Sequence, residues 1–167
     1  MIVLIMGVSG CGKTSAGKAL ALSRNWDFQD ADDWHPAENV RKMQAGIPLD
    51  DQDRAPWLDR LAGLLAEYRN SGKGLVLACS ALKERYRQRL ALGAPYTLIH
   101  LTGTRELLAA RLQARTGHFM AASLLDSQLA ALETPSAAIT IAIDQSPAEQ
   151  LAHMNQALDR IQSHHFI

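Results

Sequence analysis

One stretch decides the fold of this chain: Gly7-Val8-Ser9-Gly10-Cys11-Gly12-Lys13-Thr14, which fits the pattern G-x-x-x-x-G-K-[ST]. It follows the apolar run 2–6 and precedes a helix expected over 14–23, which is the context of a phosphate-binding loop. Its glycines let the backbone curl so that N–H groups face phosphate oxygens, and the helix N-terminus adds partial positive charge. The pattern therefore predicts a bound nucleotide, with Lys13 reaching the β- and γ-phosphates.

The same loop predicts the individual ligands of ATP and Mg²⁺. The Thr14 hydroxyl is expected to bind Mg²⁺. Cys11 lies inside the loop, and we interpret it as a small filler without a redox role. The expected nucleotide-binding residues are Gly7, Val8, Ser9, Gly10, Cys11, Gly12, Lys13, Thr14 and Ser15.

Outside the loop, short apolar runs alternate with helical patterns. Further strands are expected at 75–79, 96–101, 139–143 and, more weakly, 26–31. Alternating strands and helices predict an α/β fold with a doubly wound parallel sheet. The intervals 33–57 and 115–135 have polar and loop character, so we expect them to be excursions over the substrate.

Helix boundaries are predicted from capping residues. Gly72 is expected to end the helix that carries Leu58, Leu61, Leu65 and Tyr68. A capping box is expected at Ser123 and Asp126, and a second one begins the last helix. The last helix starts with the residues Ser146, Pro147 and Glu149.

The composition is that of an ordinary globular protein. The 167 residues predict a single domain, 1–167, and 47% of them are hydrophobic. With 17 basic and 17 acidic residues the net charge is zero, which gives no support to a partner such as nucleic acid or a membrane. Two cysteines exclude a disulfide scaffold and a four-cysteine zinc site. Since no apolar run approaches the roughly 20 residues of a membrane span, we expect a cytoplasmic protein.

The class of phosphate-loop protein follows from the motifs that accompany the loop. The guanine-binding string N-K-x-D and the switch string D-x-x-G do not occur in the sequence. The strand at 75–79 ends in Cys79-Ser80, without the acid typical of motor ATPases. Asp144 follows the strand at 139–143 and could supply that acid, but we favour a loop near the nucleotide base. The short chain is therefore best interpreted as a small-molecule kinase.

Two acids mark the expected acceptor side. Asp30 and Asp32 come at the end of the second strand, where parallel strands line the ligand crevice. Alternation along a strand would point both side chains the same way. One carboxylate, Asp30, could then hold Mg²⁺, while Asp32 accepts the proton of the acceptor hydroxyl. The alternative is an exposed acidic turn.

Basic residues could bind an anionic acceptor. Arg54, beside three acids, could clamp a carboxylate, or it could belong to a solvated charge cluster. Lys83 and Arg87 lie one turn apart and could reach the substrate from one helix face. The alternative is that this basic stretch, which includes Arg85, is a solvated helix face. His35, before Pro36, could supply a polar contact.

A closing lid is expected after the fourth strand. Arg111 and Arg115 lie one turn apart and precede Thr116-Gly117-His118-Phe119, a candidate hinge. Lid arginines would stabilise charge on the transferred phosphoryl group and contact the nucleotide. His118 could touch the substrate or cap a helix. The alternative for both arginines is an exposed helix face.

Several further strings together resemble the gluconate kinase (gluconokinase) family, in the shikimate-kinase-like group of P-loop kinases. They occur in family order over nearly the whole chain. Two departures are Ala31, where the family usually has Gly, and Ala121, where Pro is common. The matching strings are the loop 7–14, Asp30-Ala31-Asp32-Asp33-Trp34-His35-Pro36, Asn39 with Lys42-Met43, residues 46–58, Cys79-Ser80-Ala81-Leu82-Lys83 with Tyr86-Arg87, residues 115–120, Leu124-Leu125-Asp126-Ser127-Gln128, Leu132-Glu133 and Pro135.

The resemblance implies both a fold and a reaction. The implied fold is a five-stranded parallel sheet of order 2-3-1-4-5, flanked by helices and carrying a lid. The implied reaction is ATP plus D-gluconate giving ADP and 6-phosphogluconate. Arg54, Lys83 and Arg87 would clamp the carboxylate, and Asp32 would take the hydroxyl proton. Relatives are often dimers, which makes a homodimer a hypothesis; a kinase for another acid or a nucleotide, and a non-catalytic regulator, remain alternatives.

Overall fold

The computed structural model describes residues 1–116 and 120–164, whose strands form one parallel five-stranded sheet. The strand order is β2-β3-β1-β4-β5, and every neighbouring pair is parallel. This confirms the predicted fold and strand order. The strands are β1 (Ile2–Met6), β2 (Asp27–Asp30), β3 (Leu75–Ala78), β4 (Thr97–Thr102) and β5 (Ile139–Ala142).

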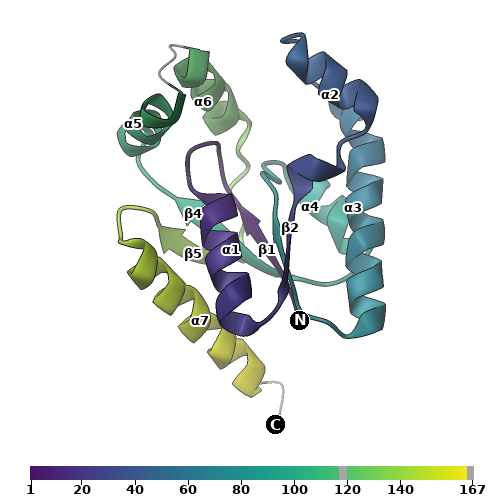
Figure 1. Ribbon diagram of the computed structural model, residues 1–167, viewed down its shortest axis with the longest axis vertical. Helices are drawn as coiled ribbons and strands as arrows, with labels where there is room; N and C mark the ends of the chain where they lie inside the picture. Colours follow the sequence, from purple (N-terminus) through teal and green to yellow (C-terminus); the bar gives the residue numbers. More distant parts are fainter. Residues whose placement is uncertain (117–119, 165–167) are drawn as a thin grey trace.

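Helices cover both faces of this sheet and extend beyond its carboxyl edge (Figure 1). Helices α1 and α7 pack on one face, and α3 and α4 pack on the other. Helix α2 and the pair α5–α6 stand on either side of the loop that follows β1. The helices are α1 (Lys13–Arg24), α2 (Ala37–Gln44), α3 (Asp51–Ser71), α4 (Glu84–Ala91), α5 (Arg105–Thr116), α6 (Met120–Ala131) and α7 (Pro147–His164), with a 3₁₀ helix, η1, at Ala31–Trp34.

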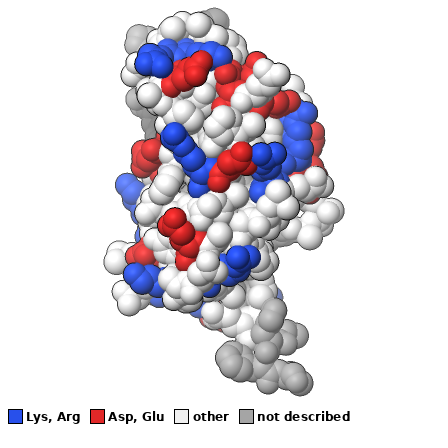
Figure 2. Space-filling model, turned by 90° about the vertical axis from the view of Figure 1, so that its right-hand side faces the viewer, with Lys and Arg blue, Asp and Glu red and all other residues white. Residues whose placement is uncertain are grey.

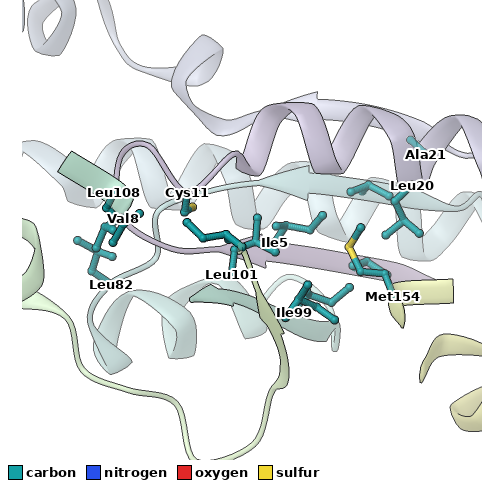
Figure 3. Close-up of a cluster of buried hydrophobic side chains, with 14 of the residues drawn as sticks. Ile5, Val8, Cys11, Leu20, Ala21, Leu82, Ile99, Leu101, Leu108 and Met154 are labelled. Carbon is teal, nitrogen blue, oxygen red and sulfur yellow. The ribbon is translucent and has the colours of Figure 1, made fainter. Parts of the chain in front are cut away.

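Strand β1 lies in the middle of the sheet and is buried over its whole length. Its side chains point alternately into two hydrophobic cores. Val3 and Ile5 pack towards α1 and α7, whereas Leu4 and Met6 pack towards α3. Figure 3 shows the first core, in which Ile5 and Met154 approach from the sheet and from α7. The continuous apolar run thus fixes β1, and with it the loop that begins at Gly7.

Two boundary predictions are confirmed by the capping contacts. Gly72 ends α3 with φ 70°, a left-handed conformation that suits glycine. At the start of α7, Ser146 N donates to the Glu149 carboxylate at 2.8 Å. Glu149 N donates in return to the Ser146 hydroxyl at 3.3 Å, which completes the capping box.

Two other boundary predictions are wrong. Helix α6 begins at Met120, so Ser123 and Asp126 lie inside it, and Asp126 instead accepts two hydrogen bonds from Arg105 of α5. The interval 33–57, expected to have loop character, is largely helical, because it contains α2 and the first turns of α3. Asp50 and Asp53 form the capping box that begins α3, a signal that apolar periodicity does not show.

The surface agrees with the balanced composition. On the face shown in Figure 2, basic and acidic side chains are interspersed. Among residues 1–116 and 120–164, every helix is too short or too polar to cross a membrane.

Candidate active site

The loop after β1 has the backbone of a phosphate-binding site. Gly10 and Gly12 have φ of 84° and 91°, and a Cβ on Gly10 would lie 2.8 Å from Leu112 Cγ. Lys13 begins α1 and its Nζ donates to the Val8 carbonyl at 3.2 Å, across the loop. Backbone N–H groups at this helix N-terminus can therefore donate to phosphate oxygens, with the lysine ammonium beside them. Cys11 is buried and desolvation raises the pKa of its thiol, as expected for a packing residue.

A side chain from α6 also holds this loop. Ser9 N donates to Gln128 Oε1 at 2.6 Å, and Gln128 Nε2 donates to Ser9 Oγ at 3.0 Å. The described part of the predicted lid therefore contacts the phosphate loop. Sequence reasoning assigned Gln128 no role, because nothing in its spacing indicates a partner 119 residues away.

The metal-binding pair predicted from the sequence comes together in the structure. Thr14 Oγ1 donates to Asp30 Oδ2 at 2.8 Å, which brings the start of α1 next to the end of β2. A hydroxyl and a carboxylate are oxygen ligands of the kind Mg²⁺ uses, and Mg²⁺ commonly keeps waters and substrate phosphates as its other ligands. The described residues contain no cluster of three or more acidic, His or Cys side chains for a metal. Because Thr14 and Asp30 supply only part of an Mg²⁺ coordination shell, the pair fits an ion whose other ligands are waters and phosphates.

Asp32 reaches the same place by a route different from the one expected. It lies in η1 rather than on β2, so strand alternation does not orient it; instead its N–H donates to Asp30 Oδ1 at 3.1 Å. Partial desolvation, followed by the nearby Asp30 carboxylate, raises the pKa of Asp32, while His35 and Lys13 oppose this shift. A carboxylate held in this way is a better proton acceptor than a freely solvated one.

Two residues of neighbouring helices fix the short segment that carries Asp32. Trp57 of α3 donates from its indole Nε1 to the Ala31 carbonyl at 2.7 Å, and both residues are buried. The His35 ring stacks on Trp57 with 4.4 Å between centroids. Ala31 keeps an ordinary backbone conformation, as the departure from glycine requires.

A basic cluster surrounds Tyr86 at the start of α4. We define it as Arg54, Lys83 and Arg85, whose charged groups lie 5.5–5.9 Å from the centroid of the Tyr86 ring. The Tyr86 hydroxyl donates to Asp51 at 2.6 Å, and Arg85 forms an ion pair with the same carboxylate. Arg85 was interpreted as part of a solvated face. Its position beside Tyr86 now adds it to the predicted residues Arg54 and Lys83.

Arg87 does not belong to this cluster. Its side chain is 4% exposed, and it donates to the carbonyls of Ala81, Leu82 and Glu133 and to the Glu84 carboxylate. These contacts use all five of its N–H donors, so none is left for a substrate carboxylate. Ala81 has φ 42°, an unusual value for alanine. Arg87 is therefore a structural residue that holds the loop before Lys83, which corrects its predicted role.

A cavity beside the phosphate loop lies between α1, α5 and α7. Its volume is about 410 Å³, and its lining includes Gly12, Ser15, Arg111 and Pro147. Arg111 Nη2 donates to the Ile143 carbonyl at 2.5 Å, which holds the guanidinium at the cavity. Strand β5 is an edge strand that ends at Ala142, so Asp144 lies in the turn that follows and is not an acid on a strand next to β1. The side chain of Arg115 and all of His118 lie outside the described residues.

Comparisons with known proteins agree with these features. Residues 9–162 match the family model "Shikimate kinase". A gluconokinase of Gluconobacter oxydans is 50% identical over 80% of this chain and 75% of its own. A probable gluconokinase of Xenopus tropicalis is 44% identical over 96% and 94%. The crystal structure of a gluconokinase from Sinorhizobium meliloti has a TM-score of 0.88 at 40% identity, covering 98% of this chain and 94% of that one.

More distant structures share only the fold. A shikimate kinase from Aquifex aeolicus superimposes with a TM-score of 0.56 at 17% identity. The phosphate loop, the order of the sheet and the similarity over nearly the whole length lead to one assignment. The chain belongs to the shikimate kinase family of P-loop kinases and, within it, to the gluconokinases.

Proposed function

We propose that this enzyme transfers the γ-phosphoryl group of ATP to the 6-hydroxyl of D-gluconate, giving 6-phospho-D-gluconate and ADP. One observation supports this acceptor above others. His35 interacts electrostatically with both Asp32 and Arg54, so an acid at the phosphate side and a member of the basic cluster both lie near one ring. A linear acceptor with a carboxylate at one end and a primary hydroxyl at the other suits this combination of an acid and a basic cluster.

ATP would occupy the phosphate loop and the adjoining cavity. Lys13 would place its charge on the β- and γ-phosphates, and Arg111 would contact the nucleotide from the cavity wall. Thr14 and Asp30 would hold Mg²⁺, which neutralises charge on the phosphates when bound. The bidentate contact of Gln128 with Ser9 would keep the loop in the shape that receives them.

On the acceptor side, Asp32 would accept the proton of the 6-hydroxyl and orient its oxygen towards the γ-phosphate. Arg54 and Lys83, with Arg85, would bind the carboxylate, and His35 would contact a hydroxyl between the two ends. Arg115 and His118 would act from a lid over 115–135, with Arg115 stabilising charge in the transition state. Residues 33–57 would form the acceptor-binding segment.

A panel of acceptors tests the proposal directly. Purified enzyme with ATP and Mg²⁺ is assayed by coupled ADP detection with D-gluconate, shikimate, other sugar acids, nucleoside monophosphates and the neutral polyol glucitol. We expect the highest kcat/KM with D-gluconate. A higher kcat/KM with another acid or with a nucleotide would identify that compound as the substrate in place of gluconate. No turnover with any acceptor would favour a non-catalytic regulator.

A further inference from the structure

Helix α2 buries one polar side chain, Asn39, which is only 3% exposed. Its Nδ2 donates to the backbone carbonyl of Asp53 at 2.8 Å and lies 3.3 Å from His35 Nδ1. A backbone carbonyl can only accept, so the group that faces it must be the NH₂ end of the amide. The contact with Asp53 therefore fixes the orientation of the Asn39 side chain.

This orientation determines the proton position on His35. The second N–H of the amide is directed at His35 Nδ1, and a hydrogen bond there requires Nδ1 to accept. A neutral imidazole that accepts at Nδ1 carries its proton on Nε2. A protonated ring would place two N–H groups against each other, so Asn39 also opposes the cationic form.

The groups around the His35 ring shift its pKa in both directions. Its face stacks on Trp57 of α3. Burial lowers the pKa of His35, Asp32 of η1 opposes this shift, and Arg54 of α3 adds to it. Lys42 of α2 and Asp53 of α3 pair with each other at 2.5 Å beside Asn39. The geometry and the charges together favour a neutral ring at neutral pH.

We propose that Asn39 is a positioning residue that keeps His35 neutral with its proton on Nε2, so that the ring donates to an acceptor hydroxyl between Asp32 and the basic cluster. The substrate contact in this inference depends on the proposed function; the proton position does not. A cationic His35 would pair with Asp32 and make that carboxylate a weaker base. Asn39 thus protects the proton acceptor while supplying a fixed donor for the substrate.

The proton position can be measured without any catalysis. Protein labelled with ¹⁵N-histidine is studied by NMR between pH 6 and 8, and the His35 signals are assigned by their loss in His35→Gln. We expect a protonated Nε2 and an unprotonated Nδ1 at pH 7 and above. A cationic ring at pH 7, a protonated Nδ1 or a mixture of the two neutral forms would overturn the inference.

Kinetics test the role of Asn39. In Asn39→Asp the introduced carboxylate accepts from Nδ1–H and raises the pKa of His35. We expect kcat/KM for gluconate to fall by roughly tenfold or more at pH 7, because the cationic ring pairs with Asp32. Towards pH 9 the loss should shrink but not vanish, because the neutral ring then carries its proton on Nδ1 and no longer donates from Nε2. In the His35→Gln background the same substitution should have no pH-dependent effect. A loss that is equal at all pH values, or that persists without His35, would show a merely structural role.

Lys42→Met provides a matched control, because it removes another side-chain contact to Asp53 without touching His35. It should leave the NMR signals of His35 and the shape of the pH profile unchanged, and a change in either would contradict the specific role of Asn39. The two proposals fail separately. Absence of turnover with gluconate refutes the proposed function, whereas the histidine spectrum decides the proton position in either case.

Discussion

Trp57→Phe should destabilise the protein more than its loss of size explains. Phenylalanine keeps an aromatic ring against His35 but removes the N–H that donates to Ala31. Ala31 is fully buried, so its carbonyl loses a partner that water cannot easily replace. An unsatisfied buried acceptor costs about 1–3 kcal/mol. In a domain of this size each kcal/mol lowers Tm by about 2–4 °C, so the expected decrease is between about 2 and 12 °C.

Circular dichroism follows this change without depending on tryptophan fluorescence, and urea titration gives the free energy of unfolding. Trp34→Phe is the matched control, because its indole donates at 3.3 Å to the side chain of Gln29, where neither group is buried. We expect the control to stay within about 0.5 kcal/mol of the wild type. Equal effects of the two substitutions would refute the argument that the Ala31 contact stabilises the segment carrying Asp32.

Further substitutions test single steps of the same argument. Asp32→Asn should lower kcat by about 10²–10⁴-fold. Because a raised pKa means that ionised Asp32 destabilises the folded state, the substitution should not lower Tm at pH 7. Any gain in Tm over the wild type should disappear below about pH 4, where Asp32 is protonated in both the folded and the unfolded state. A lower Tm at pH 7 would contradict the direction of that pKa shift. Lys13→Ala should weaken ATP binding, measured by calorimetry, and abolish phosphoryl transfer. Turnover at the wild-type rate would show that the phosphate loop takes no part in the reaction. Arg54→Met should raise KM for gluconate at unchanged ATP affinity; a fall in ATP affinity would place it on the phosphate side. Arg87→Lys should lower Tm with little change in gluconate KM. An unchanged Tm with a raised gluconate KM would show that Arg87 binds the substrate carboxylate after all.

The sequence predicted best what depends on local pattern. The apolar run 2–6 and the loop at 7–14 identify β1, the phosphate site and the start of α1, because a buried strand and a glycine loop have strict residue requirements. The pairing of Thr14 with Asp30 followed from the rule that strand ends meet at one edge of a parallel sheet.

The errors arise where tertiary contacts decide. In the sequence, Arg87 cannot be told from an exposed helix arginine. Only the fold shows the three backbone carbonyls that accept hydrogen bonds from its guanidinium group. Asp32 was expected to be oriented by a strand, whereas it lies in a 3₁₀ helix that Asp30 caps. Gln128 and Asn39 have no local signature, since their partners come from distant parts of the chain or from a neighbouring helix.

The most direct test of the central claim compares D-gluconate with glucitol, which has the same carbon chain but no carboxylate. If the basic cluster binds the carboxylate while Asp32 activates the far hydroxyl, losing the charged end should cost about 2–5 kcal/mol. That corresponds to a kcat/KM for gluconate about 30- to 5,000-fold higher, since about 1.4 kcal/mol is a factor of ten. NMR of the gluconate product should show phosphate on O6. Equal kcat/KM for both acceptors, or phosphate on another oxygen, would contradict this arrangement of the site.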